Sequence, residues 1–171
     1  DFDSLLAEAD KRGLRIILDL ALNHTSSQHP WFQKSVENIP PYNDWYIWEK
    51  TRPGQNRSAN GFILRSPTKN GKSEPPEGSW RYNDQRKQFY YAHFSKKMPD
   101  LNLTNSAVRQ EAKKIAKFWL DKGIAGFRLD AAQLIIEEDH GKMRTNTPST
   151  IQWWVEFNQY IKSLNPQAVL V

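Results

Sequence analysis

The 171-residue sequence contains no cysteine. Disulfide scaffolds, thiolate metal sites and cysteine nucleophiles are therefore excluded, while the redox compartment stays open. The sequence also lacks any apolar run near the roughly 20 residues that cross a bilayer. Its first residues, DFDSLLAEADKRG, have neither the basic start nor the apolar core of a signal peptide. We expect no membrane span and no export signal in this segment, and its localisation remains unknown.

Acidic residues are scarce in one region. The chain carries 24 Lys and Arg against 19 Asp and Glu, a net charge of +5. Residues 49–97 hold 11 of the basic residues and four of the acidic ones, so the positive excess belongs to this segment. Its charges are scattered among Gly, Pro, Ser and Asn, which is typical of a solvated surface rather than a phosphate-binding stripe. We expect no nucleic-acid partner.

Helical periodicity is present at both ends of the chain and absent from its middle. Three predicted helices are each followed by an apolar run that favours a buried strand. The helices are residues 2–12, 105–123 and 148–164, and the strands are residues 14–22, 124–131 and 168–171. The third helix has one predicted apolar face: Ile151, Trp154, Val155, Asn158 and Ile161. This order predicts a parallel α/β architecture.

The middle of the chain, about residues 25–100, is rich in aromatic residues, Pro, Gly and Asn. The stretch SWRYNDQRKQFYYAHF alternates aromatic residues around a polar turn and predicts a hairpin. We interpret the region as a small, irregular, β-containing subdomain after the first strand. Its aromatic clusters, HPWF and NDWYIWEK, are assigned mainly to its own core rather than to sugar stacking.

Two predicted strands carry polar residues near their carboxyl ends. Arg128 and Asp130 are two residues apart in an otherwise apolar run, so they point to the same face. Asp19, Ala21 and Asn23 are spaced to share one face at the carboxyl end of the first strand, and His24 follows them. Active sites of parallel α/β folds assemble at this edge. Taken alone, an Arg and an Asp at strand spacing are more often a structural ion pair than catalytic groups.

Three stretches in this order, DLALNH, MPDLN and GFRLDAA, resemble the α-amylase family of retaining glycoside hydrolases. The resemblance covers essentially the whole chain. It implies part of a (β/α)8 TIM barrel, about strands 3 to 5, with a small β-rich subdomain inserted after the third strand. The implied domains are a barrel segment at residues 1–24, the inserted subdomain at 25–103, and a second barrel segment at 104–171.

The same resemblance implies residue roles. Asp130 would be the catalytic nucleophile, and Arg128 would hold and tune it, because a guanidinium favours the charged form of a carboxylate. His24 would bind sugar in the innermost subsite, and Asp19 would be a buried acid that supports binding. Asn23 would match the asparagine that ligates calcium in many members.

Ala131, directly after Asp130, resembles the small residue of α-1,4-acting relatives more than the valine of α-1,6-acting ones. This favours α-1,4-linked glucans or maltooligosaccharides as substrates, and an α-amylase or α-glucosidase activity. The form MPDLN is intermediate between two groups of relatives and leaves specificity open. Gln133 and Leu134 stand where the family often has Lys and His, which weakens the expected calcium site. The chemistry needs no cofactor, and calcium stays an open option with Asn23 as its one nominated ligand.

A retaining glycosidase uses two carboxyl groups about 5 Å apart, one as nucleophile and one as acid and then base. The family's acid/base Glu follows the fifth strand, just beyond Val171, and a complete barrel takes about 250 residues. We therefore expect an internal segment of a larger enzyme, with the remainder of the barrel as its partner. The 171-residue chain alone is expected to be inactive.

A non-catalytic relative is the main alternative, such as the amylase-like ectodomains that chaperone amino-acid transporters. It would have a carbohydrate-binding or protein-interaction role. In such relatives the Arg-x-Asp pair or the Asn-His pair is expected to be eroded, whereas DLALNH and GFRLD are intact here. The sequence therefore favours the enzyme.

Overall fold

The computed structural model describes residues 1–53, 79–138 and 144–171. Much of the predicted basic segment, between residues 54 and 78, lies outside the described residues. Within the described part, no helix is both long enough and apolar enough to cross a membrane.

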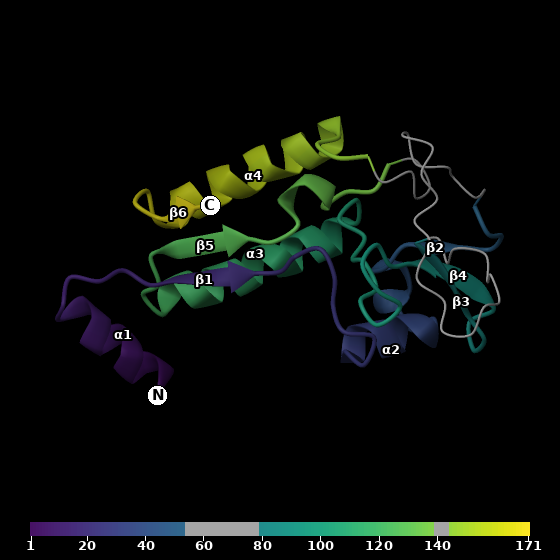
Figure 1. Cartoon of the computed structure of the whole chain (residues 1–171), viewed down its shortest axis with the longest axis horizontal. Coiled ribbons are helices and arrows are strands. Elements are labelled where there is room, and N and C mark those ends of the chain that lie inside the picture. Colours follow the sequence, from purple (N-terminus) through teal and green to yellow (C-terminus); the bar gives the residue numbers. More distant parts are fainter. Residues whose placement is uncertain (54–78, 139–143) are drawn as a thin grey trace, which may run out of the picture. The chain divides into compact units, whose positions relative to one another are not determined.

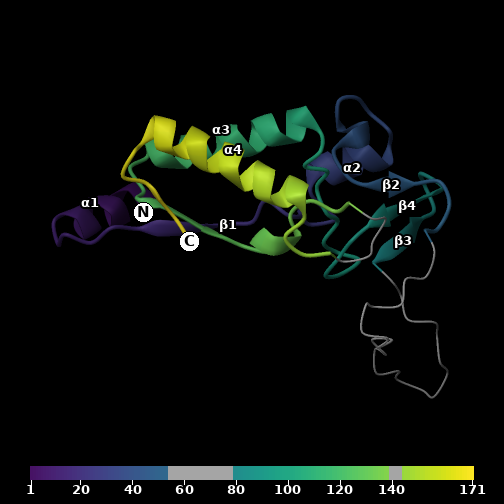
Figure 2. The ribbon, with the colours of Figure 1, turned by 90° about the horizontal axis from the view of Figure 1, so that it is seen from above.

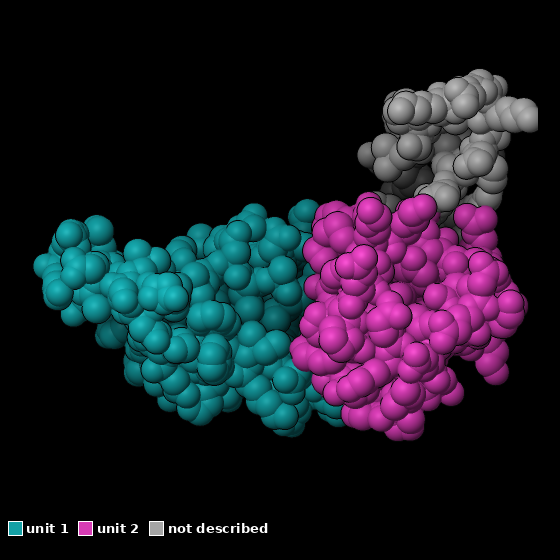
Figure 3. Space-filling view, turned by 90° about the horizontal axis from the view of Figure 1, so that it is seen from below, with its two compact units in different colours: residues 1–23, 103–136, 146–171 teal, residues 24–102, 137–145 magenta. Residues whose placement is uncertain are grey.

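The chain divides into two compact units, coloured teal and magenta in Figure 3. Unit 1 comprises Asp1–Asn23, Leu103–Ile136 and Asn146–Val171. Unit 2 comprises His24–Asn102 and Glu137–Thr145. The second part of unit 2 differs from the sequence-based division, which placed those residues in a barrel segment.

Unit 1 is built on a three-stranded parallel sheet (Figure 1). Its strands lie in the order β1 (Ile17–Leu20), β5 (Gly126–Leu129) and β6 (Val169–Leu170). Helices α3 (Ser106–Asp121) and α4 (Pro148–Leu164) lie side by side on one side of β1 and β5 (Figure 2). The predicted helix–strand order is confirmed, although β1 and β5 are shorter than the apolar runs that contain them.

Both long helices begin at capping residues that the sequence carries. The Asn105 Oδ1 accepts a hydrogen bond of 2.8 Å from the Ala107 N–H at the start of α3. The Thr147 Oγ1 accepts one of 3.2 Å from the Thr150 N–H at the start of α4, where Pro148 occupies the first turn. Each cap satisfies a backbone donor that the helix itself leaves unpaired.

The inward face of α4 differs from the predicted one. Ile161 is fully buried as predicted, but Ile151 and Val155 are 55% and 52% exposed. Trp153 and Phe157, which were not predicted, are fully buried with Ile161. Both sets have helical spacing, so periodicity alone does not choose between them. The face with two large aromatic rings is buried because removing that larger apolar surface from water stabilises the fold more.

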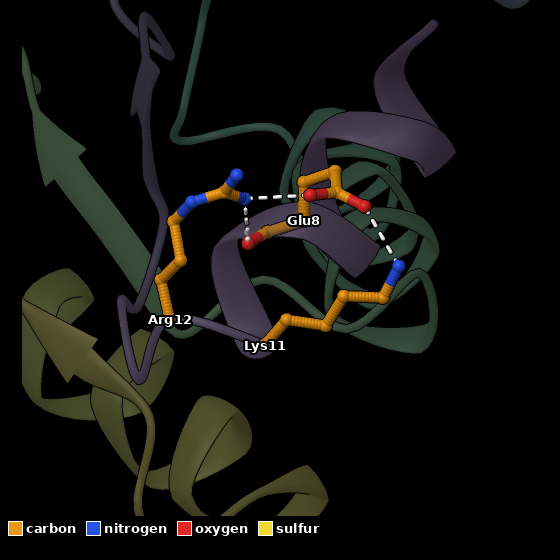
Figure 4. A network of polar contacts seen from close by, with 3 residues as sticks. All are labelled: Glu8, Lys11 and Arg12. Atoms are coloured by element: carbon orange, nitrogen blue, oxygen red, sulfur yellow. Dashed lines mark hydrogen bonds and ion pairs between the residues drawn. The ribbon is translucent and has the colours of Figure 1, made fainter.

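Helix α1 (Phe2–Asp10) ends in an exposed charge cluster, shown in Figure 4. The Glu8 carboxylate contacts the Lys11 Nζ at 2.7 Å and the Arg12 Nη1 at 2.6 Å. Lys11 first, and then Arg12, lower the pKa of Glu8. Because these side chains are solvated, the cluster contributes little to stability.

Unit 2 contains an antiparallel sheet in the order β2 (Trp48–Glu49), β4 (Gln88–Tyr91) and β3 (Trp80–Asn83). The predicted hairpin is confirmed, with Trp80 opposite Tyr91. Helix α2 (Pro30–Val36) and strand β2 were not predicted. The helix spans only seven residues, too few for a clear period, but its start carries a signal: the His29 ring accepts a hydrogen bond from the Trp31 N–H, and Pro30 follows the cap.

The core of unit 2 is aromatic, as the sequence indicated. The Phe32 ring lies 5.0 Å from the Tyr46 ring and 5.1 Å from the Tyr90 ring, and it stacks on Trp48. The Arg86 guanidinium covers the Trp48 ring at 4.3 Å and donates hydrogen bonds to the carbonyl oxygens of Ser35 and Asn43. Arg86 thus ties the hairpin turn to the end of α2.

Gly126 permits the close approach of β5 and β6, which gives a test of the sheet. A Cβ at this position would lie 1.9 Å from the Val169 carbonyl oxygen. We expect Gly126→Ala to lower the free energy of unfolding by about 3 kcal/mol or more, through overpacking and a disfavoured φ of +149°. Urea unfolding of the protein that carries this chain measures the loss.

Gly13→Ala is the matched control, since Gly13 has a φ of +67° and a Cβ there would meet no described atom within 4 Å. Gly13→Ala should lower the free energy of unfolding by only about 1–2 kcal/mol, because it adds backbone strain and no overpacking. Equal losses for the two variants would contradict the close approach.

Candidate active site

The parallel register of β1 and β5 brings three charged side chains together. Asp19 lies directly opposite Arg128. The Arg128 Nη1 donates a hydrogen bond of 2.7 Å to the Asp130 Oδ1 and lies 3.6 Å from the Asp19 Oδ2. One guanidinium therefore faces two carboxylates at the carboxyl end of β5.

This cluster is open to solvent. The side chains of Arg128 and Asp130 are 50% and 39% exposed, while Phe127 is fully buried. Successive side chains of a strand point to opposite faces, so Phe127 serves the core and Arg128 faces away from it. A polar cluster on an accessible strand end can meet a ligand without first breaking a buried ion pair.

One expectation for β1 is wrong, and another stays a prediction. The predicted burial of Asp19 refers to a complete barrel; within this chain, whose described sheet has no strand beyond β1, the Asp19 side chain is 74% exposed. It lies on the edge strand of the described sheet, on the face that carries Arg128. Asn23 does not share that exposed face: β1 ends at Leu20, so the strand alternation stops before Asn23, which is 2% exposed.

The chain turns sharply after Asp130. Ala131 has a left-handed backbone with φ +52° and ψ +28°, and it precedes the short 3-10 helix η2 (Ala132–Leu134). The Leu134 N–H donates to the Ala131 carbonyl at 2.9 Å. Left-handed geometry is uncommon for a residue with a Cβ and often marks a functional site. The small side chain predicted to matter for specificity thus occupies a constrained turn.

His24 belongs to unit 2, where it pairs with Asp100 in an antiparallel bridge. Its ring meets the Phe94 ring edge-on at 5.5 Å. Phe94 is 47% exposed, so a large aromatic surface lies beside the predicted sugar-binding histidine. Sequence reasoning missed Phe94. The available signal was an aromatic residue shortly before MPDLN and outside the alternation of the hairpin.

The MPDLN stretch is held by backbone and side-chain contacts within unit 2. Asp100 is 4% exposed, and its Oδ1 accepts a hydrogen bond of 3.1 Å from the His93 N–H. Burial lowers the pKa of His93 and raises the pKa of Tyr91, so both rings stay neutral near pH 7. This neutral setting surrounds Asp100, which pairs with His24.

The nominated calcium ligand has no cluster of metal-binding side chains around it. No group of three or more His, Asp or Glu side chains that could hold a metal ion occurs within the described ranges of the chain. A calcium ion takes about six to eight oxygen ligands. The role of Asn23 as a calcium ligand stays a prediction.

Unit 2 also contains a cavity of about 470 Å³ at the end of α2 and the hairpin turn. Its described lining is Val36, Glu37, Asn38, Gln85, Arg86 and Gln88. None of these residues belongs to the predicted site, so the cavity is separate from the predicted chemistry.

All 171 residues match the family model described as the α-amylase catalytic domain. The chain belongs to the α-amylase family. It is 42% identical over 172 aligned residues to alpha-amylase 3 of Dictyoglomus thermophilum, covering all of this chain and 28% of that protein. The crystal structure of trehalose-6-phosphate hydrolase from Bacillus licheniformis matches with a TM-score of 0.76 and 31% identity, over 99% of this chain and 30% of that one.

These comparisons confirm the α/β fold class as a portion of the family's barrel. The chain spans less than a third of the length of either relative. A third relative, an amino acid transporter heavy chain of Rattus norvegicus, is 39% identical over 161 residues, which cover 91% of this chain and 22% of that protein. The family therefore includes a relative named for transport, and function has to be argued from the site.

The exposure of the Arg128–Asp130 pair predicts that it adds little to stability. We expect Arg128→Gln to change the free energy of unfolding by less than about 1 kcal/mol, as for other solvated ion pairs. Denaturant unfolding of the 171-residue chain, to which these exposures apply, checks this.

Arg109→Gln is the matched control. The Arg109 guanidinium is 26% exposed and bonds both Glu156, at 3.1 Å, and the Leu103 carbonyl, at 2.6 Å. Arg109→Gln should lower the free energy of unfolding by about 1–3 kcal/mol, because the carbonyl of the buried Leu103 loses its donor, whereas Glu156 keeps its bond to Lys113. A larger loss for Arg128→Gln than for this control would indicate a structural pair.

Proposed function

We propose that this chain is the part of a retaining α-glucoside hydrolase that supplies the nucleophile, Asp130. The observation that carries the proposal is the 2.7 Å contact between Arg128 and Asp130 at the exposed carboxyl end of β5. Membership of the α-amylase family supports it.

In this proposal, an oxygen of the Asp130 carboxylate attacks the anomeric carbon of the bound glucosyl unit. The bond to the leaving sugar breaks as its oxygen takes a proton from a carboxylic acid elsewhere in the enzyme. Water then attacks the glycosyl ester, gives its proton to that same group and releases the Asp130 carboxylate. The net configuration at the anomeric carbon is retained.

Arg128 has two tasks in this scheme. Its hydrogen bond of 2.7 Å directs the Asp130 carboxylate, and a guanidinium does not give up its proton at neutral pH. It also contacts Asp19, which limits the rotation of the guanidinium. No cofactor takes part in these steps.

His24 and Phe94, which both belong to unit 2, are proposed to bind a sugar unit of the substrate. The imidazole can donate a hydrogen bond to a sugar hydroxyl, and the exposed Phe94 ring offers an apolar face for the C–H side of a sugar ring. Ala131 leaves room beside the nucleophile. The proposed substrates are α-1,4-linked glucans or maltooligosaccharides, and the proposed partner is the remainder of the catalytic barrel.

The alternative is a non-catalytic amylase-like domain that binds carbohydrate or protein. One similar protein is named an amino acid transporter heavy chain, but that similarity does not favour a non-catalytic role, because relatives named as hydrolases match this chain as well. The Arg128–Asp130 contact and the accessibility of both side chains weigh against it, since a binding role places no demand on that pair.

Asp130→Asn in the full-length protein is expected to reduce turnover of maltooligosaccharides or an aryl α-glucoside by at least about 1,000-fold, because an amide is a poor nucleophile. Asp130→Gly with azide and an activated α-glucoside should regain turnover and give the β-glucosyl azide. Product release and NMR of the azide measure these outcomes.

Asp121→Asn, an exposed aspartate at the end of α3, is the matched control and should retain wild-type turnover. Wild-type turnover in Asp130→Asn would refute Asp130 as nucleophile. An inactive wild-type protein that binds maltooligosaccharides would support the non-catalytic alternative.

Phe94→Ala is expected to lower kcat/KM by about 10- to 100-fold, as stacking and positioning of the sugar are lost. Tyr82→Ala is the matched control, since Tyr82 is 50% exposed on β3 and lies outside the proposed subsite. Steady-state kinetics on maltooligosaccharides compare the two. Equal losses would show that Phe94 acts through the stability of unit 2 and does not bind the sugar.

A further inference from the structure

The backbone after Asp130 adopts a conformation that needs support. Ala131 holds φ +52° and ψ +28°, a region in which the Cβ of an L-residue crowds the following carbonyl. The Asp130 N–H reaches the Leu20 carbonyl at only 3.4 Å, beyond the usual range for such a bond. On the β1 side the sheet therefore holds Asp130 weakly, and the last short bond to this end of β5 is the one of 2.8 Å from the Leu129 N–H to the Val171 carbonyl.

Helix α4 supplies a stronger contact to the same turn. The indole N–H of Trp154 donates a hydrogen bond of 2.7 Å to the Ala132 carbonyl, two residues after Asp130. The donor and acceptor are 22 positions apart in sequence. This bond joins the turn to a different element, so it fixes where the turn lies as well as its local shape.

The donor itself is held rigidly. The Trp154 ring lies 6.2 Å from the Trp153 ring and 5.8 Å from the Phe157 ring. Both neighbours are fully buried in the core of unit 1. An indole packed against two such rings has few alternative positions, so its N–H is already directed at the carbonyl before substrate binds.

A second anchor from α4 holds the far end of the same segment. The Thr150 Oγ1 accepts a hydrogen bond of 3.3 Å from the Ile136 N–H, and the Thr147 Oγ1 donates one of 2.9 Å to the Thr150 Oγ1. Both threonines and Ile136 are at most 4% exposed. The segment from Asp130 to Ile136 is thus tied to α4 at two points, of which Trp154 is the one nearer the nucleophile.

We propose that Trp154 is a positioning residue for Asp130: its hydrogen bond to Ala132 fixes the left-handed turn and thereby the direction of the nucleophilic carboxylate. This inference rests on the proposed function. Trp154 touches neither Arg128 nor the reacting atoms, and its effect passes through the backbone. Displacements of about 1 Å at a reacting group can reduce turnover by about 100-fold, so loss of one such anchor should be visible in kcat.

Trp154→Phe in the full-length enzyme removes the donor and keeps an aromatic ring. We expect kcat on an aryl α-glucoside to fall by about 10- to 100-fold, with KM within about threefold of wild type, because ground-state binding is unaffected. Single-turnover release of the aglycone should slow to the same degree, which places the loss in the attack of Asp130. The thermal midpoint should stay close to that of wild type.

Trp45→Phe is the matched control. The Trp45 Nε1 is buried and has no hydrogen-bond partner among the described residues, and Trp45 belongs to unit 2, so it is not one of the rings that hold Trp154. It should lower the thermal midpoint, by leaving a cavity in the core, while kcat stays close to wild type.

The proposal is overturned if Trp154→Phe lowers kcat by less than about fivefold or if the variant cannot be obtained folded. It is equally overturned if the whole loss of kcat/KM comes from a higher KM. It is also overturned if Trp45→Phe loses as much kcat. A wild-type protein without turnover, or an Asp130→Asn variant with full turnover, would instead refute the proposed function on which the inference rests.

Discussion

The parallel pairing of β5 between β1 and β6 is the constraint on which unit 1 depends. It places Arg128 opposite Asp19 and sets Asp130 one residue beyond the end of β5. Gly126 makes this pairing feasible, because the β6 backbone occupies the space that a side chain would need. Successive side chains of β5 point to opposite faces of the sheet, so Phe127 packs in the core while the charged residues lie on the open face.

Helix α4 serves both packing and the site. Its fully buried residues Trp153 and Phe157 stabilise the core, while Trp154, between them in sequence, reaches the turn after the nucleophile. One helix can do both because adjacent positions point in directions about 100° apart. The position of the proposed nucleophile is therefore coupled to the core through one short segment of α4.

The sequence predicted where helices and strands lie better than it predicted which of their faces are buried. The bounds of α4 and the pairing of the hairpin follow from capping, proline and aromatic alternation, which are local signals. The inward face of α4 was missed because that helix carries two apolar faces. The exposure of Asp19 within this chain was missed because it depends on which strands flank β1. The contacts of Phe94 with His24 and of Trp154 with Ala132 join distant residues, which no local pattern reveals.

The most direct test of the account is to trap the glycosyl-enzyme. A 5-fluoro-α-glucosyl fluoride should inactivate the full-length enzyme, and tandem mass spectrometry after tryptic cleavage at Arg128 should find the sugar on Asp130, in the peptide that begins at Leu129. A label on another carboxylate, or steady turnover of the same compound with inversion and no labelled peptide, would contradict Asp130 as the nucleophile.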